Sequence, residues 1–307
     1  MRLDIEKADV KIKAKRQDSL IAFIRERDNI RLARAHRMPW PWTDDPILQA
    51  YRFCNVRRRH DRTSCWIRER VIAPHQAEPT LHMFLAFCRF INWPDAICEV
   101  MDAHLWPAQP PHWRLLGDVI DQRVKRREQA WGAAFMVRGE RTSSRVPWAS
   151  WGKGRYVAEI VVEREFSNHG DALRKAMQEQ TREAVTLVMA KWYGWAGFMA
   201  GQVVDDWTWT PLLADATDHF TWAPLGPGSQ RGLNRLRGLP LTHKDKQGEG
   251  VVLMREIRKR VVGELGPAFH DLALMDIQNC LCEYDKYERV RLGQGRPRSR
   301  YHVPMPA

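Results

Sequence analysis

The chain has 307 residues and 44% of them are hydrophobic, so it can bury a sizeable core, and disorder over most of its length is excluded. Its formal net charge of +12 favours an anionic partner, of which nucleic acid is the commonest; an ordinary basic enzyme is the alternative. The N-terminus lacks a signal-peptide pattern, no apolar run is long enough to span a membrane, and the six cysteines lack the spacing of a metal or iron–sulfur site, so we expect a cytoplasmic protein with free thiols and no bound metal.

In chain order, the sequence predicts mostly helices. Residues 1–45 are expected to form a charged helical arm that ends near the MPWPW turn. An aspartate of TDDP can cap the next helix, which we expect to continue through ILQAYRFCNVRRRHDRTSCWIRERV. The apolar density of TLHMFLAFCRFI and the pattern of WRLLGDVIDQRVKRREQAW predict two more helices. We expect residues 46–290 to form one helical domain, followed by a basic tail at 291–307.

The residue pattern changes over about residues 131–168 from one typical of helices to one typical of strands, which predicts a small β insertion. The segments AAFMV and RYVAEIVVERE are rich in β-branched residues and alternate in part. GERTSSRVPWASWGKG separates them and is rich in Gly, Ser and Pro. We therefore expect a β-hairpin with a long loop, inserted in an otherwise mainly α fold.

The Gly-Pro-Gly turn of WAPLGPGSQRGLNRL predicts an anion site. Gly226 and Gly228 permit unusual backbone angles, and Ser229 can cap the helix that follows, so backbone N–H groups are exposed at a helix N-terminus. Arg231 and Arg235 lie four residues apart and share a face of that helix. We expect a helix-hairpin-helix over about residues 214–238 that grips a DNA phosphate; a plain connector is the alternative.

An arginine-rich stretch, YRFCNVRRRHDRTSCWIRER, is the first of three further candidate sites. Its dense guanidinium groups suit phosphate or pyrophosphate. On a helix, Asn55 and Arg62 share one face with Tyr51, and Arg57 and Asp61 share another. The alternative is a solvated helix face with an ion pair between Arg57 and Asp61.

Two more helical segments place polar side chains on one face. In GFMAGQVVDDWTW, Gln202 and Asp206 are four residues apart among apolar residues, which predicts either a cleft that contacts a base or a hydrogen-bonded core pair. In DIQNCLCEYDKY the acidic and basic residues form two adjacent stripes that can place an acid, a base and a phosphate contact together. The alternative there is a structural salt-bridge ladder. The stripes contain Asp276, Glu283, Asp285 and Lys286.

Taken in this order, YRFCNVRRRHDR, GQVVDDW, GPGSQRGL and DIQNCLCEYDKY resemble the motifs of phage thymine-hypermodification proteins, the α-glutamyl/putrescinyl thymine pyrophosphorylases. The chain is also similar to the amino acid:DNA transferases and to the helical domain attached to some 5-hydroxymethyluracil DNA kinases. The resemblance spans about residues 46–290. It implies a helical fold related to the helix-hairpin-helix DNA glycosylases.

The resemblance also implies a reaction in the double-stranded DNA of a phage-infected bacterium. A partner kinase pyrophosphorylates a hydroxymethyluracil, and the transferase lets a small amine, an amino acid such as glycine or a polyamine, displace pyrophosphate from the 5-methylene carbon. The chain has no GxxxxGK[ST] motif and is therefore not the kinase itself. The base must leave the stack to be reached. The candidate residues carried over are Asn55, Arg57, Asp61, Gln202, Asp206, Ser229, Asp276, Glu283, Asp285 and Lys286.

For the individual roles, we expect Arg57 to contact the leaving pyrophosphate and Gln202 or Asp206 to contact the flipped base. Asp276 or Glu283 would deprotonate the amine. No motif requires a cofactor, although a divalent cation is an alternative. Two other functions compete: a DNA glycosylase that releases a modified base, and a non-catalytic DNA-binding partner of the kinase.

Overall fold

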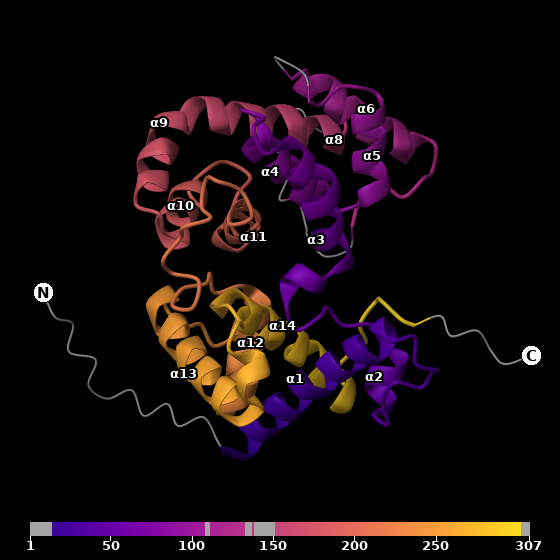
Figure 1. The fold of residues 1–307 in the computed structure, drawn as a ribbon, viewed down its shortest axis with the longest axis vertical. Helices are drawn as coiled ribbons and strands as arrows, with labels where there is room; N and C mark the ends of the chain where they lie inside the picture. The colour runs from indigo at the N-terminus through magenta and orange to yellow at the C-terminus, as the bar shows by residue number, and fades with distance from the viewer. Residues whose placement is uncertain (1–13, 108–110, 133–136, 138–150, 302–307) are drawn as a thin grey trace, which may run out of the picture. The chain divides into compact units, whose positions relative to one another are not determined.

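The computed structural model describes residues 14–107, 111–132, 137 and 151–301, and it divides the chain into two compact units (Figure 1). The first unit combines residues 1–60 with 220–307, and the second unit is formed by residues 61–219. Each unit has its own hydrophobic core. The described residues form helices and turns, with one isolated bridge between Tyr51 and Arg300, so the mainly α fold class is confirmed.

The first unit is built around its last helix, α14, against which α1, α12 and α13 pack. Figure 1 shows these four helices with the short α2 near them. The helices of this unit are α1 (Ala14–Ala35), α2 (Pro46–Ala50), η1 (Arg58–His60), α12 (Pro227–Arg237), α13 (Gln247–Leu265), η5 (Pro267–Phe269) and α14 (Leu274–Arg291).

Helix α1, expected from the sequence to belong to a separate arm, packs in the core of the first unit. Leu20, Phe23 and Ile24 are buried because they recur at helical spacing on one face. The ring of Phe23 lies 5.7 Å from the ring of Tyr284 and 4.9 Å from that of Tyr287, both on α14. The described part of the expected arm is therefore a wall of the unit that contains the acidic stripes.

Helix α2 begins as the sequence predicts but is much shorter. Asp45 caps it by accepting hydrogen bonds from the N–H groups of Ile47 and Leu48, and Pro46 stands in its first turn. The helix ends at Ala50, and the predicted continuation through the arginine-rich stretch is wrong. From Tyr51 onward the backbone is mainly non-helical up to η1, because side chains of neighbouring helices satisfy its polar groups in place of a helical ladder.

The second unit packs its helices around a large aromatic core in which Phe84, Phe166, Trp195 and Trp207 are buried. Its helices are α3 (Arg62–Ile67), η2 (Arg68–Ile72), η3 (Ala73–His75), α4 (Leu81–Ile91), α5 (Pro94–Asp102), α6 (Trp113–Lys125), α8 (Lys153–Arg155), η4 (Tyr156–Arg164), α9 (Glu165–Gln178), α10 (Arg182–Met189) and α11 (Gly197–Trp207).

The predicted β-hairpin is not seen in the described part of the chain. RYVAEIVVERE, expected as its second strand, forms the end of α8, the helix η4 and the start of α9. Tyr156, Val157 and Val161 are buried in the core of the second unit, because their spacing also matches one side of a helix. Most of AAFMV and of the loop segment lies outside the described residues. None of the described helices is long and apolar enough to cross a membrane.

His82, on α4, contributes a pH dependence to the stability of the second unit. Its ring packs against the rings of Phe166 and Trp207, with centroids 5.5 and 5.9 Å away, and burial lowers the pKa of His82 to about 4. The imidazole is therefore neutral in the folded protein at pH values where an unfolded histidine, with its ordinary pKa near 6.5, already takes up a proton.

We therefore expect stability to fall as the pH drops from about 6.5 to about 4, by up to about 3 kcal/mol from this residue. The stability that depends on the neutral, buried imidazole of His82 is fully present above about pH 6.5, the ordinary pKa of a histidine in the unfolded chain. The measurement is urea unfolding at pH 7 and pH 4.5 for the native protein and for His82→Phe, which keeps an aromatic ring and cannot titrate. An equal loss of stability in both proteins would contradict the assignment.

Candidate functional site

Three of the four sequence motifs meet along α14 in the first unit. The segment 51–60 lies against α14, since the N–H of Cys54 donates to Glu283 and the N–H of Arg58 donates to Asp276, at 3.3 and 2.9 Å. Helix α12, which carries the Gly-Pro-Gly motif, packs against the same helix (Figure 1). The fourth motif, GQVVDDW, lies on α11 in the second unit.

The carboxylate of Glu283 forms the centre of the candidate site. The residue is only 2% exposed; its Oε2 accepts from the N–H of Cys54 and its Oε1 from Nζ of Lys286, one turn further along α14. Burial opposes the charge of Lys286, but the attraction of Glu283 raises the pKa of Lys286 above its ordinary value. Lys286 is therefore an ammonium at neutral pH, and its side chain, 35% exposed, is the outer member of the pair.

Asp276 has a structural part in this arrangement. Its Oδ2 accepts from the N–H of Ala273 and completes the capping of α14, while its Oδ1 accepts from the N–H of Arg58 at 2.9 Å. Both oxygens thus hold backbone in place. Between the two residues predicted to deprotonate the amine, the geometry favours Glu283.

Arg57 is also held inside the protein. Its guanidinium forms a bidentate pair with Asp271, with Nη2–Oδ1 2.8 Å and Nε–Oδ2 3.0 Å, reaches Asp28 at 3.4 Å and lies over the ring of Phe269. The hydrogen bond from Arg57 lowers the pKa of Asp271. The alternative, an intrahelical pair of Arg57 with Asp61, is wrong because the chain is not helical at Arg57. These contacts occupy the group that we expected to meet pyrophosphate.

The other members of the arginine-rich stretch are divided between the two units. The side chain of Asn55 donates to the carbonyl of His60 at 2.6 Å and lies in the first unit. Asp61 precedes α3 as its N-cap, without a capping bond from its side chain, and Arg62 is exposed in the first turn; both belong to the second unit. The helical face predicted to join Asn55 and Arg62 is not formed.

The Gly-Pro-Gly turn begins α12, but the helix expected before it is absent. Residues 211–221 form turns, so the predicted helix-hairpin-helix lacks its first member. Ser229 is fully buried; its Oγ accepts from the N–H of Gly226 and donates to the carbonyl of the same residue, and it also receives the amide of Gln278 at 3.3 Å. Its hydroxyl thus closes the first turn of α12 and links it to α14.

The glycines of this motif let α12 approach α14 closely. A Cβ at Gly228 would meet the thiol of Cys282, and one at Gly232 would meet the backbone carbonyl of Leu281. Both of these distances would be shorter than real packing contacts allow. The side chain of Cys282 can rotate away from a Cβ at Gly228, whereas the backbone of Leu281 cannot move away from a Cβ at Gly232. Gly228 and Gly232 therefore both serve helix packing. Of the two, the sequence analysis assigned only Gly228 to the phosphate site.

We expect Gly232→Ala to destabilise the protein by about 1–3 kcal/mol, although alanine normally favours a helix, because overpacking outweighs propensity here. Gly228→Ala should cost less, and Cys282→Ala should partly restore it by removing the sulfur. Thermal or urea unfolding of the three variants measures this. A stabilising Gly232→Ala would mean that the two helices are not in close contact.

Asp285 clamps α12 to α14. It is completely buried and accepts from Nε of Arg231 at 2.8 Å and from Nε of Arg235 at 2.7 Å, with Arg289 3.7 Å away. Arg235 is itself buried, while the side chain of Arg231 is 39% exposed. The charge of Asp285 is therefore paired with arginines inside the protein. Arg231 and Arg235, which the sequence predicted to contact DNA, are in turn paired with this buried carboxylate.

The pair on α11 is separate from these contacts. Asp206 is fully buried and forms a bidentate ion pair with Arg89 of α4, whose Nη2 lies 2.8 Å from Oδ1 of Asp206 and 2.9 Å from Oγ of Ser64. Gln202, one turn earlier, is 6% exposed. Asp206 therefore makes an interaction in the core, which was the alternative to a contact with a base. Its partner is Arg89, which the sequence analysis did not name as a candidate.

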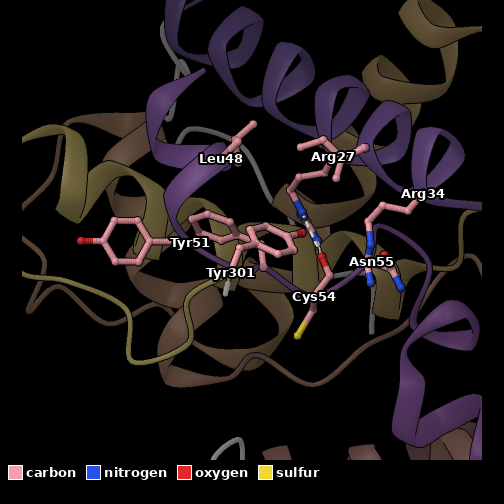
Figure 2. Close-up of a pocket in the computed structure, with 9 residues that line it drawn as sticks. Arg27, Arg34, Leu48, Tyr51, Cys54, Asn55 and Tyr301 are labelled. Carbon is pink, nitrogen blue, oxygen red and sulfur yellow. Dashed lines mark hydrogen bonds between the residues drawn. The ribbon is translucent and has the colours of Figure 1, made fainter. Parts of the chain in front are cut away.

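A pocket in the first unit adjoins the Glu283 centre and was not predicted. It is lined by α1, by the segment that follows α2 and by Tyr301 (Figure 2). Cys54 connects the two features, since its N–H bonds to Glu283 and its carbonyl accepts from Nε of Arg27 at 3.0 Å. In Figure 2 Arg27 and Arg34 extend from α1 toward the segment that carries Cys54 and Asn55. The apolar spacing of α1 was the signal that could have placed its arginines here.

Within the described ranges, no three or more His, Cys, Asp or Glu side chains are grouped so that they could hold a metal ion.

A family model described as "5-hmdU DNA kinase, helical domain" matches residues 14–296. The match begins at the first residue of α1 and extends past the end of α14, so it includes both units and all four motifs. No curated protein and no solved structure matches the chain.

Proposed function

Because the chain belongs to the family of 5-hmdU DNA kinase helical domains, we propose that it joins a small amine to a pyrophosphorylated 5-hydroxymethyluracil in double-stranded DNA. The observation that carries this proposal is the Glu283–Lys286 pair, whose carboxylate is buried close to a pocket, in a domain whose family is tied to DNA. The net charge of +12 supports a polyanionic substrate. Glycine is our first choice of amine.

The proposed step is a nucleophilic displacement. The nitrogen lone pair of the neutral amine forms a bond to the 5-methylene carbon, the bond from that carbon to the pyrophosphate oxygen breaks, and pyrophosphate leaves with its electron pair. The nitrogen is left as a charged ammonium and loses one proton to a carboxylate. Such a reaction mainly needs positioning and stabilisation of the leaving charge.

We assign the proton-accepting carboxylate to Glu283 and the first contact of the pyrophosphate to Lys286. An ammonium that sits on a carboxylate blocks its use as a base. An incoming pyrophosphate offers Lys286 a more highly charged partner, and the long lysine side chain can turn toward it. Glu283 would then be released to accept the proton from the amine.

The direct test is DNA that carries the pyrophosphorylated base, incubated with isotope-labelled glycine and with other amines. Mass spectrometry of the nucleosides should find the label joined to thymine, with one pyrophosphate released for each amine incorporated. Free base and an abasic site would identify a DNA glycosylase instead. Tight DNA binding without any product would identify a non-catalytic partner of a hydroxymethyluracil DNA kinase.

A further inference from the structure

The basic tail is fixed, up to residue 301, against the segment that follows α2. The N–H of Arg52 donates to the carbonyl of Ser299 at 3.1 Å, and Tyr51 forms an antiparallel bridge with Arg300. These contacts lie within the first unit. The tail therefore brings its arginines to a defined place on the surface of that unit.

Three arginines at this contact lie on aromatic rings. The guanidinium groups of Arg34 and Arg52 lie over the ring of Tyr301, each 5.8 Å from its centroid. The guanidinium group of Arg300 lies over the ring of Tyr51 at 5.2 Å. A ring orients a guanidinium group but has no net charge, so the positive charge is not neutralised. We call Arg34, Arg52 and Arg300 the arginine edge.

The arginine edge also lacks acidic partners. Its three side chains belong to exposed residues, and within the described residues none of them forms an ion pair with a carboxylate. Other exposed arginines of the protein do form such pairs, as Arg59 does with Asp271 and Arg126 does with Glu99. Positive charge is thus left uncompensated at this edge of the first unit.

The segments that form the edge contain few acidic residues. Residues 32–54 and 291–301 together contain seven arginines and two aspartates, with no glutamate. One of the aspartates, Asp45, caps α2 and accepts a hydrogen bond from the hydroxyl of Tyr287 at 2.6 Å. The excess of positive charge is therefore a property of the whole edge.

Such an edge suits a polyanion rich in phosphate. Arg34 and Arg52 lie over the same ring, and like charges held near one another repel until an anion binds between them. A guanidinium group already oriented by a ring loses less side-chain freedom when it binds. Its planar arrangement of N–H donors also matches the oxygens of a phosphate group.

We propose that the arginine edge binds the phosphate backbone of double-stranded DNA without regard to base sequence. The inference deepens the proposed function and rests on it for the choice of duplex DNA over another polyanion. Arg52 stands two residues before Cys54, whose N–H donates to Glu283, so the edge adjoins the candidate centre along the chain. The family match ends at residue 296, so Arg300 lies beyond it.

The test is the binding of a short fluorescent DNA duplex without modified bases, measured by anisotropy over a series of salt concentrations. The triple variant Arg34→Gln, Arg52→Gln, Arg300→Gln should bind about tenfold or more weakly near physiological salt. The slope of log affinity against log salt should decrease by about 2–3, because each lost phosphate contact removes about 0.9. The triple variant with lysine at the same positions keeps the charge and should keep the slope.

The matched control is the triple variant Lys244→Gln, Lys246→Gln, Lys259→Gln. These three lysines are exposed in the same unit, and their loss lowers the net charge by the same amount. A much smaller effect in this control than in the arginine variant supports the edge. Urea unfolding of all variants checks that each is folded.

Equal losses of affinity in the arginine and lysine variants would show that net charge alone governs binding, and would overturn the inference. Absence of duplex binding by the native protein, or equally tight binding of polyglutamate, would overturn it as well. The duplex carries no pyrophosphate and no amine is present, so this result does not depend on the transfer reaction. If the native protein binds DNA through the edge but transfers no amine, the proposed reaction fails and the edge stands.

Discussion

Replacing Glu283 with glutamine is expected to lower the rate of amine transfer by about 10²-fold or more, because the variant loses the group that accepts the proton from the nucleophile. Glutamine keeps the size and planar shape of the side chain, so its oxygen can still accept from the N–H of Cys54. The measurement is single-turnover incorporation of labelled glycine into pyrophosphorylated DNA, with the DNA affinity determined separately.

Glu288→Gln is the matched control for this variant. Glu288 lies on the same helix, is 5% exposed and pairs with Arg291 at 2.7 Å, so the substitution also breaks a partly buried ion pair. It does not touch Cys54 or the pocket residues. Equal losses of rate in the two variants would mean that Glu283 acts through stability alone. A loss confined to Glu283→Gln, with unchanged DNA affinity, supports its role as the base.

Asp206→Ala is expected to destabilise the protein by about 3–5 kcal/mol, because it leaves the buried guanidinium of Arg89 without a counter-charge. A residue that only contacts a flipped base would instead affect binding and turnover, with little effect on stability. Urea unfolding in the absence of DNA therefore separates the two roles. An unchanged free energy of unfolding would contradict the structural role.

The double variant Arg89→Met with Asp206→Leu serves as the control. It removes both charges and fills the space with apolar side chains, so it should be far less destabilising than Asp206→Ala alone. If the double variant is stable and still transfers an amine, Asp206 makes no necessary contact with the base. If the double variant is stable but inactive, the predicted contact between Asp206 and the flipped base again explains the loss of activity.

Local sequence patterns accounted for the features that depend on neighbours in the chain. The Asp-Pro start of α2, the long polar helix α14 and the pair of Glu283 with Lys286, three residues apart, follow from capping and from the helical repeat. The β-hairpin prediction failed in its second strand because β-branched residues at Val157 and Val161 fit a buried helix face as well as a strand.

Partners far apart in the chain could not be read in this way. Arg57 and Asp271 are 214 residues apart, and Arg89 and Asp206 are 117 apart. A dense arginine stretch and an acidic helix each suggest ligand binding when they are read separately. Packing then decides which charges neutralise one another inside the protein.

The sequence by itself determined the mainly helical class, the excess of positive charge and the four ordered motifs of a DNA-modifying family, because propensity, charge and motif order are properties of the chain as written. The tertiary structure alone decided that two glycines of α12 serve its packing on α14, that Asp285 holds internal arginines, and that a segment next to the tail meets α1 at a pocket beside Glu283. The physical reason is that burial and ion pairing depend on which surfaces meet, and segments distant in sequence supply those surfaces.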